Sequence, residues 1–124
     1  TYAKSGFHNI VDLGKWWKAK YDLPLPLGCN VMLRSLPDDI KSECRRMISE
    51  SIQYGLDNQE AGIDYAMQFA RDLEVSQAQK FVGMYVNDWT IDFGERGRRA
   101  VALLLDRGHK AGIIPKPVQL EFIG

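Results

Sequence analysis

Apolar residues near the start of the chain recur at the spacing of one helix face. Positions i, i+3, i+4, i+7 and i+11 are occupied by Ile10, Leu13, Gly14, Trp17 and Tyr21. The lysines of this stretch lie mostly on the other faces. The pattern predicts an amphipathic helix that needs a partner surface.

Two prolines follow this helix and stiffen the chain. Pro24 and Pro26 fix φ at about −65° and bias Leu23 and Leu25 away from the helical conformation. Residues 23–26 are therefore expected to be extended, with little conformational freedom left to lose on binding.

Beyond the prolines, apolar and polar residues alternate, which predicts a strand over residues 27–34. Its apolar face carries Leu27, Cys29, Val31 and Leu33. Its other face begins with Gly28 and Asn30. Gly28 lets a ligand or another backbone approach closely, and the Asn30 amide offers one hydrogen-bond acceptor and two donors. The same two residues also fit a plain strand start with a bulge at Gly28, and the residues alone favour that simpler interpretation.

The rest of the chain is predicted to be mainly helical, with a short strand at its end. The expected helices run over roughly 38–56, from Ile63 to about Arg71, from a capping box at Ser76, and from Asp92 to near Gly112, before a strand over 118–122. Such a layout leaves the strand at 27–34 without obvious parallel partners, although an α/β protein buries its strands between neighbours. We therefore expect this chain to be the C-terminal part of a longer protein.

Composition narrows the class of protein. The 124 residues are 45% hydrophobic and 26% charged, and 16 basic residues balance 16 acidic ones, so no overall field would recruit nucleic acid or an anionic membrane. No apolar run approaches the roughly 20 residues that a membrane span requires. Cys29 and Cys44 show no metal-binding spacing and are interpreted as buried thiols in a reducing compartment.

Several polar residues could carry chemistry, but each has a simpler explanation. His8 could act as a general base in a loop, and His109 could do so near a helix end, where a cation instead complements the helix dipole. A phosphate could bind the arginines at 96, 98 and 99, which also fit a solvated helix face. Asp38 and Asp39 could bind a metal, but their position at a helix start explains them, and we expect no metal site.

The tryptophans have the same two interpretations. Trp16, Trp17 and Trp89 could stack on an aromatic ligand, but core packing of at least one of each pair is the default. Taken together, the polar and aromatic candidates form no complete active site.

Five segments carry a resemblance to a known family. They are LGKWW at 13–17, LPLPLGCNV at 23–31, YAMQFAR at 65–71, FVGMYVNDWT at 81–90 and DFGERG at 92–97. In this order they resemble the 1,4-dihydroxy-6-naphthoate synthase family of the futalosine pathway to menaquinone, and the match covers essentially the whole chain. The sister family, chorismate dehydratase, is less similar to the second, fourth and fifth segments.

The resemblance implies an α/β architecture, namely the helix-rich C-terminal portion of a two-lobed, periplasmic-binding-protein-like type II fold. Residues 1–22 would end the smaller lobe, residues 23–30 would form a crossing segment at the cleft, and residues 31–124 would complete the larger lobe. The complete protein would be a cytoplasmic carbon–carbon lyase without a metal or organic cofactor. It would act on a small molecule, cyclic dehypoxanthine futalosine, with no nucleic acid or membrane partner. This fragment, without the N-terminal part of the same chain, would be inactive.

The resemblance also implies which residues serve the site. The catalytic base of the family is a histidine that would precede Thr1, so His8 does not inherit that role. Pro24 and Leu27 match positions that line the substrate pocket, and Gly28 and Asn30 are substrate-binding candidates because they adjoin them. Ser5 matches a pocket position where some relatives have tyrosine.

Two other classes of protein remain open at this point. A non-catalytic solute-binding protein could have the same fold. A helical interaction module could bury a partner surface with its tryptophans.

Overall fold

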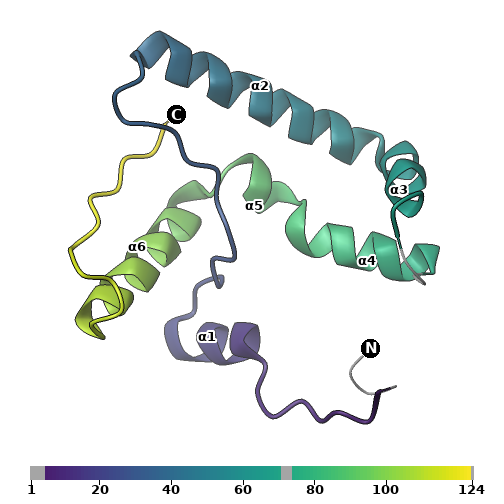
Figure 1. The fold of residues 1–124 in the computed structure, drawn as a ribbon, viewed down its shortest axis with the longest axis horizontal. Helices are drawn as coiled ribbons and strands as arrows, with labels where there is room; N and C mark the ends of the chain where they lie inside the picture. Colours follow the sequence, from purple (N-terminus) through teal and green to yellow (C-terminus); the bar gives the residue numbers. More distant parts are fainter. Residues whose placement is uncertain (1–4, 71–73, 124) are drawn as a thin grey trace. The chain divides into compact units, whose positions relative to one another are not determined.

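The structure is a computed structural model that describes residues 5–70 and 74–123. These residues form six helices, drawn in Figure 1. The helices are α1 (Leu13–Tyr21), α2 (Asp38–Asp57), α3 (Gln59–Met67), α4 (Val75–Tyr85), α5 (Asp88–Ile91) and α6 (Gly94–Lys110). Within the described ranges no residue is in a β-strand.

Helix α1 begins later than the apolar pattern predicts. The Asp12 side chain accepts a hydrogen bond of 2.9 Å from the backbone N–H of Lys15, which makes Asp12 the N-cap. Ile10 lies outside the helix and is 95% exposed, so its assignment to the helix face was wrong. A cap side chain that bonds the first turn decides where a helix starts, and apolar spacing alone does not register it.

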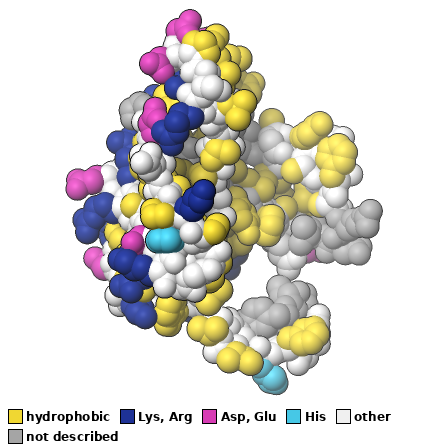
Figure 2. Space-filling model, turned by 60° about the vertical axis from the view of Figure 1, so that its left-hand side comes forward, with side chains coloured by type: hydrophobic (Ala, Val, Ile, Leu, Met, Phe, Trp, Pro, Cys, Tyr) yellow, Lys and Arg dark blue, Asp and Glu magenta, His cyan; other side chains and the backbone are white. Residues whose placement is uncertain are grey.

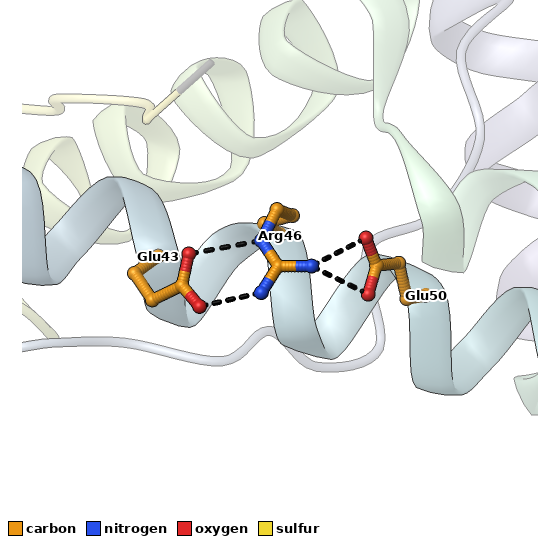
Figure 3. Close-up of polar contacts among 3 residues, drawn as sticks. All are labelled: Glu43, Arg46 and Glu50. Atoms are coloured by element: carbon orange, nitrogen blue, oxygen red, sulfur yellow. Dashed lines mark hydrogen bonds and ion pairs between the residues drawn. The ribbon is translucent and has the colours of Figure 1, made fainter.

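Helix α2 matches its predicted bounds within a residue and is reinforced by local ion pairs. Figure 3 shows Arg46 between Glu43 and Glu50, with bonds of 2.9 Å from its Nε to Glu43 and of 2.7 and 2.8 Å from its Nη1 to Glu50. The hydrogen bond from Arg46 lowers the pKa of Glu43, and the two carboxylates raise the pKa of Arg46. Spacings of three and four residues place these side chains on one helix face.

Helices α3 and α4 differ from the prediction at the ends that lie between them. Helix α3 ends at Met67, where turns take over, and the predicted end near Arg71 falls outside the described residues. Helix α4 begins at Val75 with Glu74 as N-cap and without a side-chain cap bond, so the capping box predicted at Ser76 was wrong. Ser76 lies within the first turn of the helix.

Helix α5 is short and was not predicted. The backbone N–H of Trp89 donates to the Asn87 side chain at 3.0 Å, and the backbone N–H of Asn87 donates to the Thr90 hydroxyl at 3.1 Å. This reciprocal pair is a capping box with Asn and Thr in place of the commoner Ser and Glu.

Helix α6 begins and ends as its local signals predict. The Asp92 side chain accepts from the backbone N–H of Gly94 at 2.9 Å at the start of the helix. Gly112 follows the last turn with φ +74°, a left-handed conformation that glycine adopts at little cost. A Cβ on Gly108 would lie 2.8 Å from the Ile114 side chain, so the chain folds back closely on the helix end.

Neither predicted strand is formed. Residues 27–33 and 117–123 are outside regular secondary structure, and Figure 1 draws both as extended chain. Alternating side chains describe a strand's faces, but a strand exists only when a neighbour completes its hydrogen bonds. Nothing in the described ranges supplies that neighbour. The terminal segment is instead held by an ion pair between Arg34 and Glu121 and by an edge-to-face contact of Phe93 with Phe122.

The chain divides into two compact units. One comprises the described residues up to Asn30 together with Glu95–Leu120, and the other comprises Val31–Gly94 and the residues from Glu121. The first unit buries Trp17, Leu23 and Ala100, and the second buries Ile63 and Ala78. These are small cores for units of this size.

Large apolar side chains are correspondingly exposed. Figure 2 shows hydrophobic side chains spread over the visible face among lysines, arginines and acids.

Cys29 is exposed and Cys44 is half-buried, so the prediction of two buried thiols was wrong. No helix in the described part of the chain has the length and apolar character needed to cross a lipid bilayer.

Candidate functional site

The segment that leaves α1 is anchored at its first residues. Asp22, directly after α1, has φ 52°, and its N–H donates to the Lys18 carbonyl at 2.9 Å. Leu23 follows and is buried, with 7% of its surface exposed. Pro24 to Pro26 are half-buried and continue as extended chain. The start of the crossing segment is therefore held by packing and by proline geometry.

The four residues predicted to bind substrate all lie on this one segment. Pro24 is half-buried, whereas Leu27 is 67% exposed, and Gly28 and Asn30 are exposed as well. A Cβ built on Gly28 would meet no atom within 4 Å, so no contact within this structure requires glycine there.

The chemistry available at these positions is binding rather than proton transfer. Pro24 and Leu27 offer apolar surface, Gly28 offers bare backbone, and Asn30 offers an amide that both donates and accepts hydrogen bonds. Ligand pockets are mostly apolar, with a few polar groups that fix orientation. These four positions therefore have the composition of a pocket wall and carry no acid or base.

Two neighbouring tryptophans on α1 have opposite environments. Trp17 is 4% exposed and its ring lies 4.4 Å from that of Tyr21, whereas Trp16 is 47% exposed. Core packing of one member of the pair, as predicted, is confirmed. The buried Nε1–H of Trp17 has no hydrogen-bond acceptor within the described ranges.

The two histidines do not form a site. His8 is exposed in a loop. His109 lies in the last turn of α6, and its Nδ1 is 2.9 Å from the Ile114 carbonyl oxygen, a contact that ties the helix end to the chain that folds back on it. His109 therefore has a structural partner at the position where the sequence predicts a cation at a helix end.

Two of the charged candidates, Asp38 and Arg96, contact residues outside the candidate set. Asp38 in the first turn of α2 bonds Lys41 at 2.9 Å, and no group of three potential metal-ligating side chains occurs in the described ranges. Arg96 donates from Nη2 to the backbone carbonyl of Asp22 at 2.6 Å, a contact that the sequence does not indicate.

One hollow was not anticipated from the sequence. It has a volume of about 280 Å³, belongs to the second unit, and is lined by Asp88, Trp89, Asp92, Phe93 and Gly94. It forms where α5 ends and α6 begins, and the two consecutive helix-start signals at residues 87–90 and 92–95 would have been the means to find it. Asp92 already caps α6 there, so at least one of its carboxylate oxygens serves the fold.

The chain was compared with protein families and with known proteins. A family model described as menaquinone biosynthesis matches residues 1–110. The chain belongs to this menaquinone biosynthesis family. A protein named 1,4-dihydroxy-6-naphtoate synthase from Streptomyces coelicolor is 33% identical over 115 residues, which cover 93% of this chain and 41% of that protein. A protein of the same name from Thermus thermophilus is 34% identical over 121 residues, which cover 95% and 44%.

A solved structure is similar as well. The crystal structure of a protein from Archaeoglobus fulgidus matches with a TM-score of 0.84 and 36% identity, over 91% of this chain and 43% of the other. The resemblance to the 1,4-dihydroxy-6-naphthoate synthase family is thus confirmed. The chain spans about two fifths of the length of these relatives.

Proposed function

We propose that this chain is the C-terminal part of a 1,4-dihydroxy-6-naphthoate synthase. The complete protein converts cyclic dehypoxanthine futalosine into 1,4-dihydroxy-6-naphthoate and a sugar-derived fragment, as a carbon–carbon lyase in the cytoplasm. The observation that carries the proposal is the match to two proteins of that name over 93% and 95% of the chain. Membership of the menaquinone biosynthesis family supports the same pathway.

The fold that goes with this proposal is the two-lobed, periplasmic-binding-protein-like type II fold. Residues 1–22 end the smaller lobe, residues 23–30 cross at the cleft and residues 31–124 complete the larger lobe. The extended segments at 27–33 and 117–123 support this fold, because both have strand-like sequences without a partner in the described part of the chain. Residues from the rest of the protein pair with them in the complete enzyme.

Within the complete enzyme, residues 24–30 form one wall of the substrate pocket. Leu27 supports this role because an exposed leucine beside stiff prolines gives apolar surface at low ordering cost. Pro24 continues this apolar surface, and Gly28 and Asn30 provide backbone approach and an amide contact. The catalytic histidine belongs to the part of the protein that precedes Thr1, and His8 has no role in the chemistry.

The test is an assay of two purified proteins. The complete protein that contains this chain should convert cyclic dehypoxanthine futalosine to 1,4-dihydroxy-6-naphthoate, as followed by chromatography of the product. Residues 1–124 alone should give no product. Turnover by residues 1–124 would refute the assignment of the base to the missing part.

Failure of the complete protein on this substrate would refute the synthase itself. Chorismate, offered in a parallel reaction, separates the two related activities. Dehydration of chorismate by the complete protein would replace the synthase with a chorismate dehydratase.

A further inference from the structure

The direction in which the chain leaves α1 depends on one residue with an unusual backbone. Asp22 has φ 52°, and no other non-glycine residue in the described ranges has a positive φ. The left-handed conformation is unfavourable for residues with a Cβ, although Asp tolerates it better than most. Such a conformation persists when surrounding contacts hold it in place.

Those contacts come from Lys18 of α1 and from Arg96 of α6. Arg96 lies 74 residues further along the chain, and its Nη2 donates to the Asp22 carbonyl oxygen at 2.6 Å and lies 3.8 Å from the carboxylate Oδ1. Lys18 forms the local pair with the carboxylate, and its Nζ is 3.5 Å from the same carbonyl oxygen. The short bond to the carbonyl is thus the particular contribution of Arg96.

A second arginine of α6 reaches the preceding residue. The guanidinium carbon of Arg107 lies 5.8 Å from the centre of the Tyr21 ring. Arg96 and Arg107 are 11 residues apart, which is close to three helical turns, so both lie on one face of α6 and about 16 Å apart along its axis. Their side chains reach the end of α1 from two points on that face.

The carbonyl of Asp22 belongs to the peptide group that joins Asp22 to Leu23. Fixing this group sets the course of the chain into buried Leu23 and then into Pro24 and Pro26, whose φ angles are already restricted. Leu27 and Gly28 follow directly and are exposed. A rotation of the peptide group after Asp22 would therefore displace the whole pocket wall.

We propose that Arg96 is a positioning residue for the substrate. By holding the carbonyl of Asp22 it keeps residues 24–28 in the geometry that receives the substrate, without touching the substrate itself. The inference rests on the proposed function, because the wall has a substrate only if the complete protein is the synthase. Loss of the bond lowers the fraction of protein with a competent wall, and apparent affinity falls in proportion to that fraction.

The experiment compares three variants of the complete protein. Arg96→Gln removes both the positive charge and the planar set of guanidinium donors. Arg96→Lys keeps the charge but loses the donors held in one plane. Arg99→Gln is the control, because it changes an exposed arginine on the same helix. Arg96→Gln should raise KM for cyclic dehypoxanthine futalosine between about threefold and tenfold with kcat changed by less than about twofold. Arg96→Lys should lie between Arg96→Gln and the wild type, and Arg99→Gln should match the wild type.

Hydrogen exchange supplies a readout that does not depend on turnover. The backbone amide of Asp22, which donates to the Lys18 carbonyl, and the amide of buried Leu23 should exchange faster in Arg96→Gln than in Arg99→Gln. Equal KM and equal exchange in these two variants would overturn the proposal. So would a fall in kcat with KM unchanged and no rescue by Arg96→Lys, since that is the signature of a merely structural role. If the wild type shows no lyase activity, the proposed function fails, and the exchange data still decide whether Arg96 holds the segment.

Discussion

Residues 23–26 and residues 27–30 are consecutive parts of one segment in one compact unit, yet their environments differ sharply. Leu23 is 7% exposed and Leu27 is 67% exposed, although both are leucines next to a proline. The residues of the first part are buried or half-buried, and those of the second part are all exposed. Residues 23–26 thus form the anchored part of the segment, and residues 27–30 form its exposed part.

This difference separates stability from binding. A buried leucine contributes to folding through the apolar surface it removes from water, whereas an exposed leucine contributes little until something covers it. Substitutions in the anchored part should therefore change the free energy of unfolding. Substitutions in the exposed part should change the interaction with the proposed substrate.

The largest effect is expected from shortening the Leu23 side chain in the anchored part of the segment. Leu23→Ala in the complete protein should lower the free energy of unfolding by about 2–5 kcal/mol, because it removes buried surface and leaves a cavity. Leu27→Ala is the matched control and should stay within about 0.5 kcal/mol. Denaturant titrations of both variants measure this. An equal loss of stability in both variants would show that Leu27 is a core position covered by the rest of the protein. The distinction between the anchored part and the exposed part would then fail.

A charge on the wall is the next largest change. If Leu27 lines the proposed pocket, Leu27→Asp should raise KM by at least about tenfold or abolish turnover, because an ionised carboxylate would then face the apolar part of the substrate. Circular dichroism and the unfolding midpoint should remain those of the wild type. Unchanged kinetics would remove Leu27 from the pocket.

A single methyl group tests the wall more finely. Gly28→Ala should leave stability unchanged, because a Cβ there meets no atom of this chain within 4 Å. Steady-state kinetics should show a rise in KM of about twofold to fivefold if the substrate approaches the backbone at Gly28. An unchanged KM would make Gly28 a simple start of the extended segment.

The smallest expected change concerns the carboxylate of Asp22, directly before the anchored part of the segment. The hydrogen bond from Lys18, then the charge of Lys18, then the charge of Arg96 lower the pKa of Asp22 below its ordinary value of 3.8. A lowered pKa gives stability that is present above the unfolded-state value and is lost as the pH falls through the folded-state value. Lys18→Gln should therefore raise the pKa of Asp22 more than Arg96→Gln does.

Carboxyl-carbon NMR titration of the complete protein, with labelled aspartate, measures this order. A larger rise in Arg96→Gln would show that the distant arginine and not the neighbouring lysine controls the carboxylate. The acid-induced loss of stability below the ordinary pKa should also be smaller in Lys18→Gln than in the wild type.

The helices were largely predictable because their signals are local. Pro37 with Asp38 and Asp39 marks the start of α2, Asp92 caps α6, and Gly112 ends it with a left-handed turn. The errors also have local causes. At α1 the Asp12 cap starts the helix later than the apolar spacing predicts, and at α4 the N-cap is Glu74 and not Ser76. Helix α5 is too short for an apolar period to be visible.

The candidate site was predictable only as a segment. Proline positions and the family resemblance point to residues 24–30, and the structure shows them as one extended run. The sequence could not indicate that Asp22 would meet Arg96, because a contact between residues 74 apart depends on how the chain folds back. It contrasts with Arg46, whose carboxylate partners lie three and four residues away and follow from helix geometry.

The sequence by itself thus determined the five longer helices, though not all their ends, together with the stiffness of residues 23–26 and the family. Capping, φ restriction and motif order are properties of neighbouring residues. Only the tertiary structure decided which leucine is buried, that the alternating residues 27–33 form no strand in this chain, and that α6 holds the end of α1. Burial and strand pairing depend on what the rest of the fold places beside a residue. An alternating pattern describes two faces of a chain but does not say what covers either one.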